Sequence, residues 1–292
     1  MAKTSIEWTD TSWNPLRGCS RVSEGCRHCY AESVANRFKG PGMPYEGLIA
    51  PGGQWNGKIN LIHSKLREPF TWRKPRRVFV NSMSDLFHEK VPSHFIDDVF
   101  LVMAQCPEHI FQILTKRPER MREYFEGSEL ENHLNTSLKI IDNPDTKPVK
   151  WPLPNVWLGV SVEDQQTADE RLPDLLNCPA AIHWASVEPL LGPLDLSEYV
   201  KSLRWHISDT PMESWLNWVV VGGESGCNAR PIEAFWVRSL RDQCKTTHTP
   251  FFFKQWGEYM PDRNEKMIRV GKKNATRFLD SVEWNQYPTL SD

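Results

Sequence analysis

Short, nearly uninterrupted apolar runs recur along the chain, and segments with helical periodicity separate them. The apolar runs cover residues 78–82, 110–115, 156–162, 181–187, 218–223 and 250–255. The helical patterns cover residues 93–104, 119–125, 164–176 and 233–244. Strands of this kind are buried on both faces, and their alternation with helices is typical of a parallel sheet with right-handed crossovers. With Pro15-Leu16 as a first strand, the pattern predicts an α/β fold, a partial or complete (β/α) barrel of TIM-like type with parallel strands.

The length of 292 residues and the 39% apolar content are ample for one large buried core. We expect one barrel domain over residues 1–262 and a polar C-terminal extension over residues 263–292 that packs on the barrel. No apolar run reaches the length of a signal peptide or a membrane span, so we expect a soluble, cytoplasmic protein without membrane association.

The formal net charge of −2 gives no argument for a polyanionic partner or an anionic membrane. Local charge is less even, because six cations lie within thirteen residues between Lys65 and Arg77, and a second group runs from Lys116 to Arg122. These stretches indicate either an ordinary solvated face or a surface that contacts phosphates.

Three cysteines lie within eleven residues near the N-terminus, at Cys19, Cys26 and Cys29. Three thiolates bound to a four-iron cube leave one iron open to a small-molecule ligand, whereas structural zinc normally takes four protein ligands. The cysteines therefore predict a [4Fe–4S] cluster with an open iron. A Cys₃His zinc site that adds His28 or another histidine is the alternative, because the same loop would supply it.

The other four cysteines, Cys106, Cys178, Cys227 and Cys244, are far apart in the sequence. An odd total of seven without a secretion signal does not indicate a disulfide framework. We expect these four to be small buried apolar residues, one of which lines the site in the alternative interpretation.

Polar residues follow the predicted strands, where parallel α/β folds bind their ligands. They include Asp85, Lys116, Arg117, Ser161, Glu163, Glu188, Glu224 and Lys254. We expect them to meet the cysteine loop at one rim of the sheet. Gly222-Gly223 after an apolar strand allows a backbone to approach a ligand closely, although a tight turn explains the pair equally well.

These residues carry a resemblance. A three-cysteine loop after a first strand, followed by a βα barrel, resembles the radical S-adenosylmethionine superfamily, although the spacing here is C-x6-C-x2-C instead of C-x3-C-x2-C. The wider pattern resembles a phage-encoded family of uncharacterised proteins. It is carried by Asn81-Ser82-Met83-Ser84-Asp85, Leu114-Thr115-Lys116-Arg117-Pro118, Gly159-Val160-Ser161-Val162-Glu163, Ser186-Val187-Glu188-Pro189 and Gly222-Gly223-Glu224-Ser225-Gly226.

The resemblance implies S-adenosylmethionine as cofactor beside a cluster held by Cys19, Cys26 and Cys29, and cleavage to a 5′-deoxyadenosyl radical that abstracts hydrogen. It implies that Asn81, Ser82 and Ser84 hold the methionine amino group, that Ser161 and Glu163 meet the ribose, and that Lys116 or Arg117 neutralises the carboxylate. The further implied cofactor contacts are Asp85, Glu188, Gly222 and Gly223. The implied catalytic residues are Cys227, Glu224 and Lys254.

The resemblance also implies a reductant such as flavodoxin or ferredoxin. The substrate it suggests is a nucleic-acid base or nucleoside, in hypermodification or isomerisation of thymidine in phage DNA or in repair of a base lesion, so that the enzyme would be an isomerase, a lyase or related. DNA or a modified nucleoside is then a partner. The alternative from another class is a zinc-stapled protein without catalysis that binds nucleic acid or protein.

Overall fold

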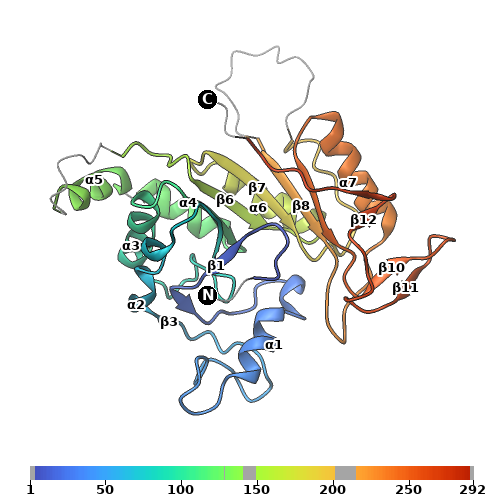
Figure 1. Ribbon diagram of the computed structural model, residues 1–292, viewed down its shortest axis with the longest axis horizontal. Coiled ribbons are helices and arrows are strands. Elements are labelled where there is room, and N and C mark those ends of the chain that lie inside the picture. Colours follow the sequence, from blue (N-terminus) through green and yellow to red (C-terminus); the bar gives the residue numbers. More distant parts are fainter. Residues whose placement is uncertain (1–3, 128, 141–148, 201–214, 290–292) are drawn as a thin grey trace.

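A seven-stranded parallel sheet forms the centre of the computed structural model, which describes residues 4–127, 129–140, 149–200 and 215–289 (Figure 1). The strands lie side by side in chain order, so each crossover adds the next strand at the same edge. In that order they are β1 (Thr11–Trp13), β4 (Arg77–Val80), β5 (Ile110–Thr115), β6 (Val156–Ser161), β7 (Ile182–Val187), β8 (Trp218–Gly222) and β9 (Phe251–Gln255). The sheet is curled into an open half-barrel with β1 and β9 at its edges, which confirms the predicted partial barrel.

Helices pack on one face of this sheet and share its main core. Those between the strands are α3 (Ser93–Ala104), α4 (Pro118–Gly127), α5 (Leu130–Ile140), α6 (Gln165–Leu176) and α7 (Ala234–Thr246). At the start of α6, Asp164 accepts a hydrogen bond from the Thr167 amide at 2.9 Å in a capping box, which explains why this helix begins where the sequence predicts.

The opposite face of the sheet has two layers. Towards the amino ends of the strands it carries a buried aromatic cluster, in which Trp157, Trp184 and Trp218 pack with Trp8 and Phe79. Gly159 makes room for this cluster, because a Cβ there would lie 2.4 Å from the Trp184 ring. Since side chains alternate along a strand, Ser161 lies on the same face as Trp157, nearer the carboxyl end. The aromatic layer therefore ends below a more polar layer.

The first strand of the sheet is not the one that the sequence indicates. β1, at Thr11–Trp13, pairs with β4, whereas Pro15-Leu16 leads into β2 (Leu16–Arg17), which pairs antiparallel with β3 (Asn60–Leu61) outside the main sheet. The cysteine segment follows β2 and contains η1 (Glu24–Cys26) and α1 (Tyr30–Arg37). The remaining elements before β4 are α2 (His63–Leu66) and η2 (Pro69–Thr71).

The C-terminal part adds two hairpins beside β9. They are β10 (Tyr259–Pro261) with β11 (Met267–Arg269), and β12 (Phe278–Leu279) with β13 (Val282–Glu283). The Trp256 indole donates to the Phe278 carbonyl at 2.9 Å, so residues of the predicted extension pack against the sheet end. The first hairpin joins both sides of the predicted boundary at residue 262, and the division into a domain and an extension stays a prediction. Residues 290–292 lie outside the described residues.

Among the helices of the described residues, none combines the length and the apolar character that crossing a bilayer requires.

Candidate functional site

A cavity of about 140 Å³ lies at the carboxyl ends of β4, β5 and β6, and all three cysteines of the N-terminal loop line it. The other predicted site residues that line this cavity are Asn81, Ser82, Ser84, Asp85, Lys116, Arg117 and Ser161. The predicted residues that are not among its lining residues are Glu163, Glu188, Gly222, Gly223, Glu224, Cys227 and Lys254. The structure thus brings together the cysteines and the residues after the second, third and fourth strands of the sheet.

The three thiols are free of disulfides and close enough to influence one another. The pKa of Cys19 is raised to about 12, mainly by burial and also by the charges of Asp85, Cys29 and Cys26, while Arg117 opposes the shift. Burial also raises the pKa of Cys29, against the effect of the Glu32 and Ala31 amides at the start of α1. Because a metal binds the thiolate, a metal bound by Cys19 and Cys29 would displace protons that these two thiols hold more firmly than usual.

The donor set suits a metal cluster in its chemistry: three soft sulfur ligands share one cavity wall. In the described residues, no three or more His, Cys, Asp or Glu side chains stand in the arrangement of a metal site. The three thiols are therefore suitable ligands that would have to converge further to bind one group.

Asn81 is the most unusual polar residue of the cavity. It follows β4 with a φ of 63°, and the residue is 2% exposed. Its backbone amide donates to the Trp13 carbonyl at 2.8 Å, but neither atom of its side-chain amide has a hydrogen-bond partner. A buried polar group left unpaired costs about 1–3 kcal/mol, so an amide kept in this state suits a ligand with both a donor and an acceptor.

The neighbouring serines are already engaged. Ser82 donates its hydroxyl to Asn14 Oδ1 at 3.2 Å, and Ser84 donates to the Leu16 carbonyl at 3.0 Å. Tyr30 adds a bond from its hydroxyl to the Ser82 carbonyl at 2.6 Å. These bonds hold the loop after β4 against the N-terminal segment, which leaves Asn81 as its unpaired side chain at the cavity.

Asp85 organises the rim and has no free oxygen. Oδ1 accepts from Thr115 Oγ1 at 2.7 Å and from the Phe87 amide at 3.0 Å. Oδ2 accepts from the Lys116 amide at 3.2 Å and from Arg117 Nη1 at 2.9 Å. This buried carboxylate therefore joins the loop after β4 to the loop after β5.

Glu163 joins the cysteine loop to the end of β6. Its buried carboxylate is paired with Lys116 and with Arg171 Nη1, the latter at 3.1 Å, and it accepts from Ser23 Oγ at 3.0 Å. Gly25 packs on the same carboxylate, since a Cβ there would lie 2.3 Å from Glu163 Oε1. Glu163 thus pairs with two cations, Lys116 and Arg171, and holds the loop that carries the cysteines.

Glu224 fixes the other end of this loop after β8. It accepts from His28 Nδ1 at 3.0 Å and from Arg230 Nη2 at 2.7 Å, and Arg230 also donates to the Glu24 carbonyl at 2.9 Å. Burial opposes ionisation of Glu224, but the bonds from Arg230 and His28 outweigh it and lower the pKa of the carboxyl. His28, the extra ligand of the zinc alternative, is therefore bonded to a carboxylate and is not a lining residue of the cavity.

The remaining predicted residues make contacts of their own. Glu188 pairs with Lys254 Nζ at 3.0 Å. The two glycines serve packing, because a Cβ on Gly222 would lie 2.3 Å from Glu188 Oε1 and one on Gly223 would lie 2.1 Å from the Trp256 carbonyl oxygen.

The predicted catalytic residues Cys227, Glu224 and Lys254 do not share the cavity. Cys227 is exposed, so the expectation that it is buried is wrong, whereas Cys106, Cys178 and Cys244 are buried as expected. The exposed Cys227 follows β8 by five residues on a turn that Arg269 contacts through the Cys227 carbonyl at 2.8 Å.

Neither basic stretch faces the cavity as a set of free cations. The stretch from Lys65 to Arg77 ends at the first residue of β4, so it lies at or before the amino end of this strand, whereas the cavity lies at the carboxyl end. In the second group, Lys116 and Arg117 pair with Glu163 and Asp85, and Arg122 pairs with Glu126 at 2.7 Å. A role for either stretch in phosphate binding stays a prediction.

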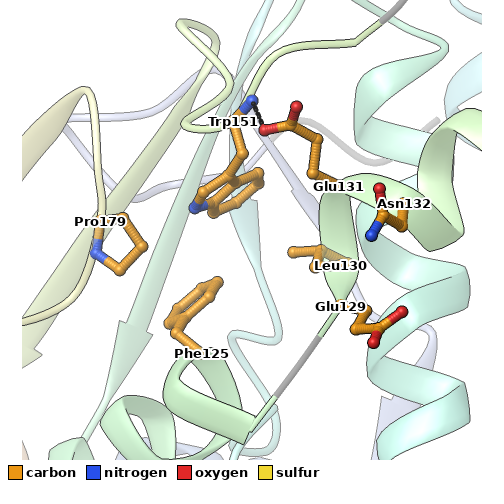
Figure 2. A pocket seen from close by; sticks show the side chains of 7 residues that line it. All are labelled: Phe125, Glu129, Leu130, Glu131, Asn132, Trp151 and Pro179. Atoms are coloured by element: carbon orange, nitrogen blue, oxygen red, sulfur yellow. Dashed lines mark hydrogen bonds between the residues drawn. The ribbon is translucent and has the colours of Figure 1, made fainter.

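Figure 2 shows a second cavity, of about 410 Å³, beside α4 and α5. Its lining residues are Phe125, Glu129, Leu130, Glu131, Asn132, Trp151 and Pro179, which include neither a cysteine nor a cation. The rings of Phe125 and Trp151 stack at 5.3 Å between centroids, and the Trp151 amide donates to Glu131 Oε2 at 3.0 Å. The cysteine cavity is therefore the better candidate for chemistry.

A family model described as "Protein of unknown function (DUF5131)" matches residues 3–288. The chain belongs to this family. No curated protein matches it. A structure of spore photoproduct lyase complexed with dinucleoside spore photoproduct has a TM-score of 0.41 and 10% identity, over 88% of this chain and 68% of that chain. The family description assigns no activity, so an activity has to be inferred from the side chains at the cavity.

Sequence reasoning missed the partners that hold the cysteine loop in this DUF5131 protein. Arg171 and Arg230 have no motif around them. Ser23 and Gly25 lie within the cysteine motif, but nothing in the sequence indicates their common partner Glu163, which lies 140 residues from Ser23 in the chain. The rule that parallel sheets bind ligands at the carboxyl ends of their strands located the carboxylates, but the partners of these carboxylates come from distant elements.

Proposed function

We propose that this chain is a radical S-adenosylmethionine enzyme whose [4Fe–4S] cluster is held by Cys19, Cys26 and Cys29. One observation carries the proposal: three free thiols and the unpartnered, buried amide of Asn81 line one cavity at the carboxyl edge of a parallel half-barrel. The thiols suit the cluster, and the amide suits a small polar ligand beside it.

When bound, the cluster and S-adenosylmethionine supply one-electron chemistry that generates a carbon radical, and an external reductant such as flavodoxin or ferredoxin provides the electron. The chain's own residues divide the binding. Asn81 offers one acceptor and a pair of donors to the polar end of the ligand. Lys116 and Arg117 are each paired with a carboxylate of the chain, so in this proposal they shape the rim and are not free cations for a ligand carboxylate.

We extend the proposal to a nucleic-acid base or nucleoside as substrate. Tyr30 supports it, because its half-exposed ring lines the cavity directly after Cys29 and its hydroxyl is fixed on the Ser82 carbonyl. An oriented aromatic ring at a cavity provides a stacking surface for a base. A Tyr30→Leu variant should weaken binding of the productive nucleoside while leaving the iron content unchanged.

The cysteine variants test the proposal. Anaerobic reconstitution should give the wild-type protein about four irons and four sulfides per chain, and Cys19→Ala, Cys26→Ala and Cys29→Ala should each lose most of them. The matched control is Cys227→Ala, since this thiol is exposed and does not line the cavity. Stoichiometric zinc in anaerobically prepared wild-type protein, or equal iron in all variants, would contradict the proposal.

A further inference from the structure

Arg117 uses every donor of its guanidinium at the rim of the cysteine cavity. Nε donates to Glu89 Oε2 at 3.3 Å, and Nη2 donates to the carbonyl and the hydroxyl of Ser20 at 3.2 and 2.7 Å. Nη1 donates to Asp85 Oδ2 at 2.9 Å and to Cys19 Sγ at 3.9 Å. Five N–H groups thus meet five acceptors, one of which is a thiol of the cavity.

The five bonds fix Arg117 in place. Its side chain is 10% exposed, and Asp85, its main ionic partner, is 7% exposed. Ser20 and Cys19 are adjacent in the chain, so Arg117 forms hydrogen bonds with both the backbone of the cysteine loop and the first sulfur of this loop. A guanidinium held in this way keeps both its position and its charge, because arginine does not lose its proton in proteins.

The other two thiols receive different donors. Cys26 Sγ lies 4.0 Å from the Ser23 hydroxyl, and Cys29 occupies the N-cap position of α1, where the Glu32 and Ala31 amides influence its thiol. Arg21 lies near Cys26 and Cys29, but its guanidinium pairs with Glu32, to which it donates a hydrogen bond at 2.6 Å. Among the described residues, Cys19 is therefore the thiol of this loop that has a cationic hydrogen-bond donor.

We propose that Arg117 raises the reduction potential of the cluster by its hydrogen bond and charge at Cys19. This inference rests on the proposed function. Hydrogen bonds to the ligating sulfurs and nearby positive charge favour the reduced cluster, which carries one more negative charge than the oxidised one. Loss of Arg117 also removes the cation that offsets the negative charges of Asp85 and Glu89 near Cys19, and this lowers the reduction potential further.

Redox titration of the reconstituted protein, followed by electron paramagnetic resonance, tests the proposal. Arg117→Gln should shift the midpoint potential to a more negative value, and Arg117→Lys should give a smaller shift, because lysine keeps the charge but cannot make the five bonds. The control is Arg122→Gln, which removes a cation five residues away that pairs with Glu126 and Asp174. Its potential should match that of the wild type.

A spectroscopic measurement decides the matter if Arg117→Gln does not fold. Wild-type protein labelled with ¹⁵N at the terminal guanidinium nitrogens should show ¹⁵N coupling to the reduced cluster in pulsed electron paramagnetic resonance, and Arg117→Lys should lose it. A wild-type cluster without this coupling, or equal potentials for Arg117→Gln and the wild type, would overturn the inference alone. A wild-type protein that takes up no cluster would overturn the proposed function and the inference with it.

Discussion

At the scale of single residues, the site contains three carboxylates whose hydrogen bonds are formed within the protein and one side-chain amide that has no hydrogen-bond partner. Asp85, Glu163 and Glu224 each accept several hydrogen bonds and hold loops together. Asn81 is buried in a left-handed backbone conformation, and its side-chain amide forms no hydrogen bond. Strained backbone and an unpaired buried group at one residue indicate a ligand site, because folding alone gains nothing from either.

Asn81→Gly separates these two roles. Glycine adopts a positive φ without strain and removes the unpaired amide, so the ligand-free protein should be as stable as the wild type or more stable by up to about 1 kcal/mol. Urea unfolding measures this stability, and the spectral response of the reconstituted protein to S-adenosylmethionine measures binding, which should weaken at least tenfold. A clear loss of stability without a change in binding would show that the amide is structural.

Gly25 should tolerate no side chain. The Cβ of Gly25→Ala would overlap the buried carboxylate of Glu163, and overpacking of this kind costs about 1–3 kcal/mol. The variant should therefore lose stability and reconstitute with less iron. Gly127→Ala is the control, because nothing lies within 4 Å of its Cβ position. Equal iron and stability in both variants would contradict this role for Gly25.

At the scale of elements, the sequence located most of the sheet and its helices. Runs of buried residues predicted β5 to β9 within one or two residues, and the amphipathic patterns predicted α3, α4, α6 and α7. β1 was not predicted, because a strand of three residues, Thr11–Trp13, is too short to show an alternating hydrophobic pattern. The loops between the elements were predicted least well, since their bonds join residues that are far apart in the chain.

The cysteine loop is held by such long-range bonds, and a substitution at Glu224 tests their contribution to stability. Glu224→Gln keeps the size of the side chain but removes the buried anion that pairs with His28 and Arg230, and leaves Arg230 with the exposed Glu24 alone. Breaking a buried ion pair costs about 3 kcal/mol. Thermal or urea unfolding should detect this loss, and hydrogen exchange should rise in residues 19–29. The control is Glu24→Gln, which removes the exposed partner of the same Arg230 and should change stability by less than about 0.5 kcal/mol. Similar effects of the two variants would contradict a clamp centred on Glu224.

At the scale of the whole molecule, an open half-barrel is filled with aromatic residues near the amino ends of its strands and carries its candidate site near the carboxyl ends. The rule that ligands bind at the carboxyl edge predicted this placement from the positions of polar residues after strands. The rule could not tell which residues face the cavity. Glu163 and Lys254 satisfy it but are engaged in ion pairs outside the lining of the cavity.

The edge strand β1 ties the N-terminal segment to the sheet, and this attachment should depend on pH. Partial burial opposes ionisation of Asp10, but its hydrogen bonds and ion pair with Arg77 outweigh burial and lower the pKa of Asp10 below its ordinary value. A carboxyl with a lowered pKa stabilises the fold above its unfolded-state pKa, and this contribution disappears as the pH falls through the folded-state value.

Urea unfolding of the wild type and Asp10→Asn should therefore differ at pH 6, with the wild type more stable, and the difference should shrink as the pH falls below about 4. Asp262→Asn is a suitable comparison, because Asp262 lies at the far hairpin and its oxygen accepts from backbone amides at 2.8 and 2.9 Å without an arginine partner. A difference between wild type and Asp10→Asn that is constant from pH 6 to pH 3 would contradict the assigned cause.

The central claim is that Cys19, Cys26 and Cys29 hold a cluster with an open iron. The most direct test is the electron paramagnetic resonance spectrum of anaerobically reconstituted, reduced wild-type protein before and after addition of S-adenosylmethionine. The account predicts a reduced [4Fe–4S] signal whose line shape changes when the cofactor is added, because the cofactor binds the open iron. A protein that holds zinc and gives no such signal, or a cluster signal that S-adenosylmethionine leaves unchanged, would contradict it.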